Sequence, residues 1–439
     1  MRNVSLRLLL AVIALAFLSP FAFASWVDLG GTGVDVSVLE NTPQRIALEF
    51  RVGGFERSDV VIDGASYARI TLPGEALLLE KGLPELPSVA RSVIIPDDRR
   101  MELRVVESEH VDLAGLAPIP SKGNLLRNVD PAAVPWEFAD FYRTGGQYPA
   151  EIAFQREPYI MRDFRGTAVV ASPFVYDAGS RTLRVYTRLV VELVDAGPGG
   201  ANVLQRDKAV SRHSAEFEEI YQHHFLNWGG QKYNMVPETG WMLVICYDDF
   251  APQMAPFVRW KNEMGLPTEM VLKSAIGTTS TQIKDYIQSR YSGSSSPRLA
   301  YVLLVGDAAQ IPTPSASGGS SDPSYSKLAG GDNYPDIFVG RFSAENASHV
   351  QTQVSKVVNY EKLPLLAGNS WYPRGVGIGS NQGPGDDGEY DYQHLNNIRT
   401  DLLDYGYTLV DQIYDPNANA AMVAAAVNAG RTIINYTGH

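Results

Sequence analysis

The residue of this sequence best placed for chemistry is its final one, His439. Residues 432–436 have the pattern of a buried strand, and Thr437 and Gly438 form the turn that ends it. In open α/β sheets, chemistry gathers beyond the carboxyl ends of the strands, and an imidazole titrates near neutral pH. The position therefore predicts a catalytic histidine. The alternative is a histidine that stands at the end of the sequence without a role.

The single cysteine, Cys246, would be needed for a reaction that uses a thiol, but its neighbours argue against that role. Val244, Ile245 and Tyr247 surround it in "LVICY", which we expect to be a buried strand. A thiol in apolar surroundings has a raised pKa and packs as a small apolar group. We predict a structural role for Cys246. One cysteine also excludes a disulfide within the chain.

Three histidines, His213, His223 and His224, lie in a stretch of Gly, basic and helix-like polar sequence between the two halves of the chain. A metal site there is conceivable, but no cluster of carboxylates or cysteines stands at ligand spacing. The sequence favours surface histidines. We interpret residues 201–240 as a linker with a packed connecting helix.

Residues 25–200 have the pattern of β-structure. In "TLRVYTRLVVELV", apolar side chains alternate with Arg184, Arg188 and Glu192, which is the period of a strand buried on one face. The same alternation recurs, with Pro and Gly between the runs, at residues 44–52, 67–72, 101–106 and 166–175. This pattern predicts a β-rich, sandwich-like domain with little helix. We find no catalytic constellation in it.

From residue 241 onward, strands alternate with helices. Apolar strand patterns such as "WMLVICY", "LAYVLLVGD" and "GVGIGS" are joined by helical patterns such as "TSTQIKDYIQSRY" and "QHLNNIRTDLLDYG". Strands that are apolar on both faces and joined by helices predict a mostly parallel sheet that is covered on both sides. The loops "GDAAQIP" and "SNQGPGDDGEYDYQH" follow two of these strands and are further candidate sites.

The composition limits the classes of partner. With 439 residues, of which 45% are hydrophobic and 20% charged, the chain can bury at least two cores. It has 37 basic and 49 acidic residues, a net charge of −12, and no long basic cluster. Because phosphate binding needs a positive field, we expect no nucleic acid partner.

The N-terminus has the pattern of an export signal. Arg2 and Arg7 flank a polar start, residues 8–18 are apolar, and Ala22 and Ala24 supply the small side chains that a signal peptidase reads. We predict a signal peptide over residues 1–24 and a secreted or cell-surface protein. The alternative is a membrane anchor, but the run is shorter than the roughly 20 residues that a bilayer needs. We expect no membrane span after cleavage.

Several motifs resemble those of a known family. "YVLLVGDAAQIP", "SDPSYSKLAGGDNYPDIFVGRFSAE", "YDYQHLNNI" and "INYTGH" are similar, in order and spacing, to the gingipain family of secreted cysteine peptidases, whose catalytic domain is related in fold to the caspases. "KGLPELP" and "RGTAVVASPFVYDAGSRTLRVYTRLVVEL" resemble the β-rich propeptide of that family. The resemblance implies a propeptide domain over residues 25–200, a linker and activation region over 201–240, and the N-terminal part of an α/β caspase-like domain over 241–439.

The resemblance gives His439 the role of the catalytic general base, which converts the thiol of a cysteine into the attacking thiolate. In the family, that cysteine lies farther along the chain, after the next strand. We therefore expect the sequence to be the front part of a longer precursor that is inactive as given.

Two further residues receive roles from the resemblance. Asp391 matches an aspartate in the primary specificity pocket of the arginine-cleaving members, where a carboxylate selects a basic side chain; alternatively, it caps the helix that it opens. Asn381 matches the carboxylate that orients the catalytic histidine, a task that an amide also performs. Asp386 or Asp387 could take over from Asn381. We expect His394 to be structural.

A calcium site is also implied by the resemblance. Asp332, Asp336 and the backbone of Tyr334 lie in "GGDNYPDIF", a loop comparable to one that holds calcium in gingipains, and oxygen ligands suit this cation. The alternative is a solvated acidic turn, and Asp307 is a weaker candidate. We expect no organic cofactor.

The sequence thus predicts the zymogen of a secreted cysteine endopeptidase that acts on polypeptides through a Cys/His dyad. Its own propeptide would inhibit it until a cut between about Arg206 and Met235. The alternative is a secreted, non-catalytic binding or surface module on the same fold. A cysteine at the end of the next strand would favour the enzyme.

Overall fold

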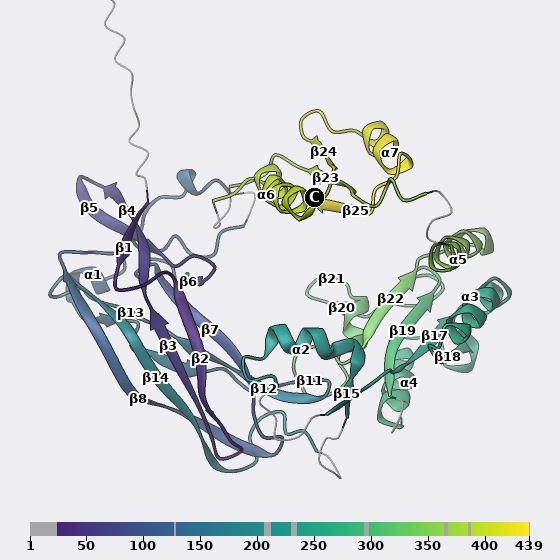
Figure 1. The fold of residues 1–439 in the computed structure, drawn as a ribbon, viewed down its shortest axis with the longest axis horizontal. Coiled ribbons are helices and arrows are strands. Elements are labelled where there is room, and N and C mark those ends of the chain that lie inside the picture. Colours follow the sequence, from purple (N-terminus) through teal and green to yellow (C-terminus); the bar gives the residue numbers. More distant parts are fainter. Residues whose placement is uncertain are drawn as a thin grey trace, which may run out of the picture.

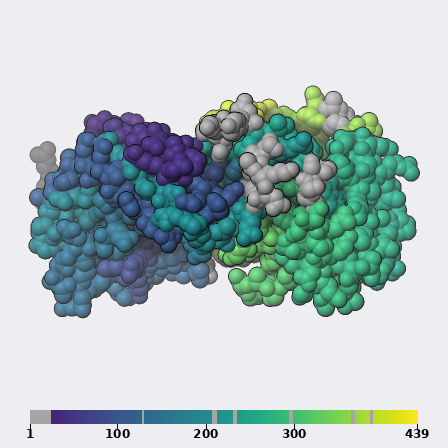
Figure 2. Space-filling model, turned by 90° about the horizontal axis from the view of Figure 1, so that it is seen from below, coloured from purple at the N-terminus to yellow at the C-terminus, as the bar shows by residue number. Residues whose placement is uncertain are grey.

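The computed structural model describes residues 24–126, 129–205, 212–229, 235–293, 298–363, 368–384 and 388–438. These residues form two lobes joined by a narrower region (Figure 2). We call residues 24–205 the N-terminal half, residues 212–240 the connecting segment and residues 241–438 the C-terminal half. The predicted signal peptide, apart from Ala24, lies outside the described residues, as does His439.

The N-terminal half is built from strands (Figure 1). They are β1 (Ser25–Asp28), β2 (Val34–Asn41), β3 (Arg45–Val52), β4 (Gly54–Ile62), β5 (Ala65–Thr71), β6 (Ala76–Leu78), β7 (Leu86–Ile94), β8 (Arg99–Ala114), β9 (Gln147–Tyr148), β10 (Ala153–Gln155), β11 (Tyr159–Met161), β12 (Phe164–Ala171), β13 (Phe174–Asp177) and β14 (Thr182–Pro198), with the short helix α1 (Phe141–Thr144). One large sheet has the order β2-β3-β14-β13-β9, with β8 also paired to β14. A second has the order β10-β12-β7-β6, with β11 paired to β12, and a third is β1-β4-β5.

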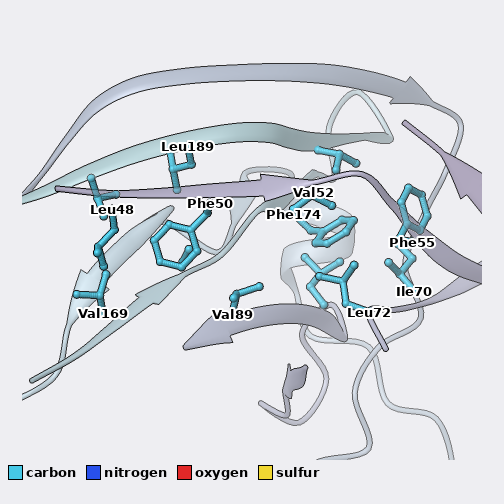
Figure 3. Packing of buried hydrophobic residues seen from close by; sticks show 14 of the residues in the cluster. Leu48, Phe50, Val52, Phe55, Ile70, Leu72, Val89, Val169, Phe174 and Leu189 are labelled. Atoms are coloured by element: carbon cyan, nitrogen blue, oxygen red, sulfur yellow. The ribbon is translucent and has the colours of Figure 1, made fainter. Parts of the chain in front are cut away.

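The core of this half lies between the two large sheets (Figure 3). Leu48 and Leu189 come from β3 and β14 of one sheet, and Val89 and Val169 come from β7 and β12 of the other; each is at most 1% exposed. The alternation predicted for β14 is confirmed. The alternate apolar side chains from Leu183 to Leu193, which were predicted to lie opposite the charged ones, are buried. The sandwich-like prediction is therefore confirmed.

One predicted strand, residues 166–175, is divided in two. β12 ends at Ala171 and pairs with β7, whereas β13 begins at Phe174 and pairs with β14 in the opposite sheet. Ser172 and Pro173 lie at this crossing. Proline has no N–H to donate to a ladder, so it suits the point at which the chain leaves one sheet.

The connecting segment contains β15 (Arg212–Ser214), the 3₁₀ helix η2 (Ala215–Phe217), α2 (Glu218–His224) and β16 (Val236–Glu238). β15 and β16 are parallel partners. The aromatic side chains of this segment pack against both halves: Phe225 lies near Phe164 of the N-terminal half, and Phe217 lies 4.6 Å, centroid to centroid, from Phe338 of the C-terminal half. The segment therefore belongs to the hydrophobic cluster that joins the two lobes.

The C-terminal half contains two parallel sheets. The first has the order β18-β17-β19-β22 and consists of β17 (Trp241–Cys246), β18 (Thr268–Leu272), β19 (Leu299–Val305) and β22 (Phe338–Phe342). The second has the order β24-β23-β25 and consists of β23 (Arg374–Gly379), β24 (Leu409–Tyr414) and β25 (Ile433–Thr437). A small hairpin of β20 (Ser315–Ala316) and β21 (Gly319–Ser320) follows β19. The predicted parallel architecture is confirmed, with its strands divided between two sheets.

Helices cover these sheets. They are α3 (Ala251–Glu263), α4 (Ser280–Gly293), α5 (Ala347–Lys362), α6 (Asp391–Tyr405) and α7 (Ala420–Asn428). α3 and α5 place Met254, Phe257, Val350 and Val354 on one face of the first sheet. α4 places Ile283 and Ile287 on the other face. The first sheet is thus apolar on both faces, as its sequence pattern indicates.

Candidate functional site

The candidate site lies at the carboxyl edge of the sheet β24-β23-β25. β23 and β25 run parallel, with Gly379 opposite Thr437. Beyond that pair, the backbone N–H of Ser380 donates to the carbonyl oxygen of Thr437 at 3.0 Å. His439 follows Gly438 directly in the sequence. The backbone that leads to His439 is therefore held beside the end of β23.

Glycine residues let the elements of this edge approach closely. A Cβ added to Gly438 would lie 3.2 Å from the Cβ of Ser380, and one added to Gly379 would lie 2.7 Å from Cδ1 of Leu395 in α6. Gly375, Gly377 and Gly379 alternate along β23, so they share one face of the strand. This face lets α6 pack directly on β23, which brings the first residue of α6 to the carboxyl edge.

That first residue is Asp391, which is only 3% exposed. The hydroxyl Oγ of Ser380 donates to Oδ2 of Asp391 at 2.5 Å, and the N–H of Asp391 donates to the carbonyl oxygen of Gln382 at 2.9 Å. The N-cap position of α6 is Tyr390 rather than Asp391. The alternative that Asp391 caps the helix is thus wrong, because its carboxylate faces the end of β23 through Ser380.

Asn381 lies in the loop after β23 and is exposed. Its neighbour Ser380 holds the adjacent strand end, so Asn381 stands one residue from the backbone contact between β23 and β25. Asp386 and Asp387, the alternatives to Asn381, lie outside the described residues. A role of Asn381 toward His439 stays a prediction. His394 lies on the exposed side of α6, with Nδ1 3.1 Å from Oε2 of Glu389.

Cys246 is fully buried at the end of β17. Burial, and secondly the nearby Asp248, raises the pKa of the Cys246 thiol to about 12. Its Sγ lies 3.2 Å from the carbonyl oxygen of Tyr247. A thiol in this position is protonated at neutral pH, which supports the predicted structural role.

β25 pairs with β23 on one side and, among the described residues, has no strand on its other side. Two large apolar side chains of this strand are exposed, Ile434 by 51% and Tyr436 by 61%. In a parallel sheet covered by helices, such side chains are normally buried. Among the described residues, the outer edge of β25 therefore has backbone groups with which a further strand could pair, and one face of β25 has an apolar surface that is not covered.

The acidic loop before β22 lies at another place, between the two halves. Oδ2 of Asp332 accepts from the N–H of Ile160 at 2.7 Å, and Oδ1 of Asp332 accepts from the N–H of Tyr334 at 2.9 Å. Asp336 is fully buried and accepts from three backbone amides, those of Arg162, Leu328 and Ala329.

Burial raises the pKa of Asp336 to about 6, while the three amide hydrogen bonds act in the opposite direction. All four carboxylate oxygens of Asp332 and Asp336 accept hydrogen bonds from backbone N–H groups. Among the described residues, no group of three or more His, Cys, Asp or Glu side chains is arranged to hold a metal ion. Calcium at this loop stays a prediction.

The histidines of the connecting segment have protein partners. Nε2 of His224 lies 2.6 Å from the hydroxyl of Tyr159, and burial lowers the pKa of His224. Nδ1 of His223 lies 2.8 Å from the carbonyl oxygen of Glu219. His213 is 3% exposed, so the expectation of a surface histidine is wrong at this position, where its ring packs 5.3 Å from that of Trp228.

Ser380, Arg162 and Asp163 are not among the residues predicted from the sequence. Ser380 had a usable signal, since it is the first polar residue after the glycine-alternating strand "GVGIG". The sequence gives no signal for Arg162 and Asp163 other than the turn-like residues around them. Each helix within the described ranges is too short or too polar to cross a membrane.

Comparison with known proteins divides the chain within the connecting segment. Residues 29–225 match the family model Propeptide_C25, and residues 236–439 match the model of peptidase family C25. The chain is 33% identical to gingipain R1 of Porphyromonas gingivalis over 97% of its own length and 43% of that protein. It is 32% identical to gingipain R2 of the same species over 99% of its own length and 59% of that protein. The chain thus spans about half the length of these curated relatives.

A solved structure, that of the Arg-specific cysteine proteinase gingipain R, is also similar. The identity is 35% over 46% of this chain and 47% of that one, with a TM-score of 0.43.

Proposed function

Because the chain belongs to the gingipain family, with the family's propeptide followed by the beginning of its peptidase domain, we propose that it is the zymogen part of a secreted cysteine endopeptidase. In this proposal the N-terminal half is the propeptide and keeps the enzyme latent. The C-terminal half carries the general base and the specificity residue. Export rests on the sequence pattern of residues 1–24.

One observation carries the proposal: Ser380 joins the strand end that precedes His439 to the carboxylate of Asp391. Its N–H bonds Thr437, and its Oγ bonds Asp391. General base and specificity group must lie on one edge if the same bound peptide is to meet both. The contacts of Ser380 provide that common edge.

The proposed reaction begins with a cysteine thiol that a longer polypeptide supplies. His439 takes the proton from this thiol, and the thiolate attacks the peptide carbonyl to form an acyl-enzyme. His439 then returns the proton to the leaving amine, and water hydrolyses the acyl-enzyme. The outer edge of β25, which pairs with no strand among the described residues, offers a place for the strand that brings this cysteine.

In the proposed enzyme, Asp391 determines the preference for substrates with a basic side chain. A carboxylate held in a buried position by a hydroxyl favours a guanidinium or ammonium group over a neutral side chain. Peptides with a basic residue before the cleaved bond are therefore the proposed substrates. We assign the orientation of His439 to Asn381, since an amide can accept from an imidazole N–H.

The test uses the chain extended by the rest of its peptidase domain, after removal of the propeptide. We expect peptidase activity that a thiol-blocking reagent abolishes. His439→Ala should lower kcat by about 1,000-fold or more, because general base catalysis and thiolate formation are both lost. The matched control is His394→Ala, which removes an exposed histidine of α6 and should leave kcat within about twofold.

Full activity of the His439→Ala enzyme would exclude the proposed base. If the extended chain has no thiol-dependent activity, the result would instead favour the alternative, a non-catalytic binding or surface module.

The specificity residue has its own test. Asp391→Asn keeps the shape of the side chain and removes its charge, so kcat/KM for a substrate with arginine should fall by about 100-fold or more while that for a neutral substrate changes little. Glu389→Gln is the control, because Glu389 lies two residues away and bonds His394 and Asn397. Equal losses for both substrates would show that Asp391 supports the fold and not the selectivity.

Calcium remains a proposal for the peptidase after the propeptide has left. In the zymogen, amides of Ile160 and Arg162 bond to Asp332 and Asp336, so we expect the unfolding temperature of the chain to be the same in calcium and in chelator. A calcium-dependent stabilisation of the chain that Asp332→Asn removes would locate the ion in the zymogen as well.

A further inference from the structure

We propose that the amino edge of the sheet β18-β17-β19-β22 is a docking surface for the propeptide, and that the turn Arg162–Asp163 is the element it recognises. This turn joins β11 to β12 in the N-terminal half, with Met161 opposite Phe164. Both residues are almost completely enclosed, with Arg162 2% exposed and Asp163 fully buried. A charged two-residue turn in such a position needs partners for its charges and hydrogen bonds.

Arg162 finds its partners in the C-terminal half. Its Nη1 donates to the carbonyl oxygen of Leu299 at 2.8 Å and to that of Asp336 at 2.6 Å. Its backbone N–H donates to Oδ1 of Asp336 at 2.9 Å. The side chain and the backbone of one propeptide residue therefore bind the first residue of β19 and the loop before β22.

The backbone of Arg162 has a φ of +48°, in the left-handed region that side chains other than glycine adopt rarely. Surrounding contacts must hold such a conformation in place. The contacts of Arg162 with Leu299 and Asp336 serve this purpose, which supports a specific fit.

Asp163 joins all three parts of the chain. Its Oδ1 bonds Nη2 of Arg298, the residue before β19. Its Oδ2 accepts from the N–H of Ser214 at 2.7 Å and from the hydroxyl of Tyr221 at 2.9 Å, both in the connecting segment. The fully buried Asp163 carboxylate thus has its charge balanced by an arginine of the peptidase half.

Contacts around the turn are those of an interface with a buried centre. The rings of Tyr159 and Tyr334 stack 3.8 Å apart, and Asn202 bonds both Pro158 and the N–H of Gly331. Binding energy in interfaces concentrates in such enclosed, charged and aromatic centres. We therefore assign the largest share of the affinity to Arg162 and Asp163.

The docking surface shares no residue with the candidate catalytic site. Arg298 and Leu299 stand at the start of β19, and Asp336 stands before β22. Ser380, Asp391 and the end of β25 belong to the other sheet. Retention of the propeptide and blockage of the catalytic site are thus separate properties of the zymogen.

The experiment measures how fast the propeptide leaves after the chain has been cut. A recognition sequence for a site-specific protease is inserted after the exposed Gly229, the purified full chain is cut, and the dissociation rate of the two fragments is recorded on a surface that captures the C-terminal fragment. We expect the wild-type fragments to stay together. Arg162→Ala and Asp163→Asn should each raise the dissociation rate by on the order of 100-fold, because each leaves buried partners without their hydrogen bonds.

Matched controls come from another turn of the N-terminal half. Arg181 is exposed and has a φ of +53°, so Arg181→Ala changes an arginine in the same backbone conformation away from the interface. Oδ1 of Asp177 accepts from the N–H of Ser180 at 2.9 Å, so Asp177→Asn alters a turn aspartate of the same half. Both should dissociate within about threefold of the wild type.

If the Arg162→Ala chain does not fold, Arg298→Gln removes the partner of Asp163 from the other side and should raise the same rate. Dissociation of the wild type immediately after cutting, or rates for the Arg162, Asp163 and Arg298 variants equal to those of the controls, would overturn the proposal. Peptidase activity is not measured, so failure here leaves the proposed function untouched.

Discussion

Two buried aspartates, one on each sheet of the C-terminal half, reach burial by different means. Asp336, at the amino edge of the first sheet, accepts hydrogen bonds from Leu328 and Ala329 of its own half and from Arg162 of the propeptide. Asp391, at the carboxyl edge of the second sheet, accepts from Ser380 of its own half. The described contacts of Asp336 thus include a residue of the N-terminal half, whereas the described contact between Asp391 and Ser380 lies within the C-terminal half.

This difference separates the contacts that the proposed activation would change from those that it would preserve. When the propeptide leaves, Asp336 loses the amide and the guanidinium of Arg162. The bond between Ser380 and Asp391, and that between Ser380 and Thr437, involve no propeptide residue. We therefore expect the bond between Ser380 and Asp391, the proposed specificity residue, to be in place before the proposed activation, and we expect the contacts at the amino edge of the first sheet to change on activation.

Among the tests of this comparison, Asp336→Ala should cause the largest loss of unfolding free energy. It leaves the backbone amides of Arg162, Leu328 and Ala329 without their acceptor. A buried donor left unsatisfied costs about 1–3 kcal/mol of unfolding free energy, so we expect a total loss of about 3 kcal/mol or more. Urea unfolding followed by fluorescence measures the change. Asp332→Ala, at a partly exposed site, should cost about 1 kcal/mol. Equal costs at the two sites would contradict the special position of Asp336.

The pH dependence of stability tests the same residue. The pKa of Asp336 is about 6 in the folded chain, above the 3.8 of an ordinary aspartate. The stabilisation is therefore complete below about pH 3.9 and is lost as pH rises through about 6, by up to about 3 kcal/mol. Asp332, Lys284 and Tyr291 are titratable groups that interact with the Asp336 carboxylate, and the Arg162 guanidinium donates to the backbone carbonyl oxygen of Asp336.

The measurement compares urea midpoints between pH 4 and pH 7 for the wild type and Asp336→Asn. The variant cannot titrate at this position, so its midpoint should fall less over that range. Parallel curves for the two proteins would assign the pH dependence to other groups.

A smaller effect is expected at the other edge. Ser380→Ala removes the hydroxyl that bonds Asp391 and should lower the unfolding free energy by about 1 kcal/mol. In the extended, active chain it should reduce the preference for arginine over a neutral residue by about 10-fold. Ser274→Ala is the control, because it deletes the same kind of hydroxyl bond, to Asp248, at an exposed position. A larger loss at Ser274 would contradict the role of Ser380.

The smallest effect is expected for Cys246→Ala, which removes one sulfur from the core of the first sheet and should cost about 1 kcal/mol or less. Because the pKa of Cys246 is about 12, the native chain should not react with an alkylating reagent at pH 8 until it is unfolded. Mass spectrometry of the treated chain measures this. Rapid labelling of the native chain would reopen a chemical role for Cys246.

Local pattern was sufficient to predict much of the fold. The alternation in β14 predicted which side chains are buried, because a strand between core and solvent must alternate. The rule that chemistry gathers beyond strand ends identified the residues after β23 and β25 as candidate sites, and Ser380 bonds Thr437 there. The sequence did not reveal that the parallel strands divide into two sheets, since periodicity does not tell which strand is the neighbour of which.

Contacts between the halves could not be predicted in this way. Arg162 lies 137 positions from Leu299, and Asp163 lies 135 positions from Arg298. Neither has a periodic pattern or a motif that points to its partner. The N-cap of α6 was also missed, because Tyr390 has no preference for that position and is placed there by the packing of α6 on β23.

The carboxylate of Asp163 has a consequence for how the molecule comes apart. Its hydrogen bonds reach both the C-terminal half and the connecting segment. None of the three parts can therefore separate from the others without leaving this buried charge exposed to water or without a partner. Despite its two-lobed outline, the intact chain should therefore melt as one cooperative unit, with a single heat-absorption peak in calorimetry.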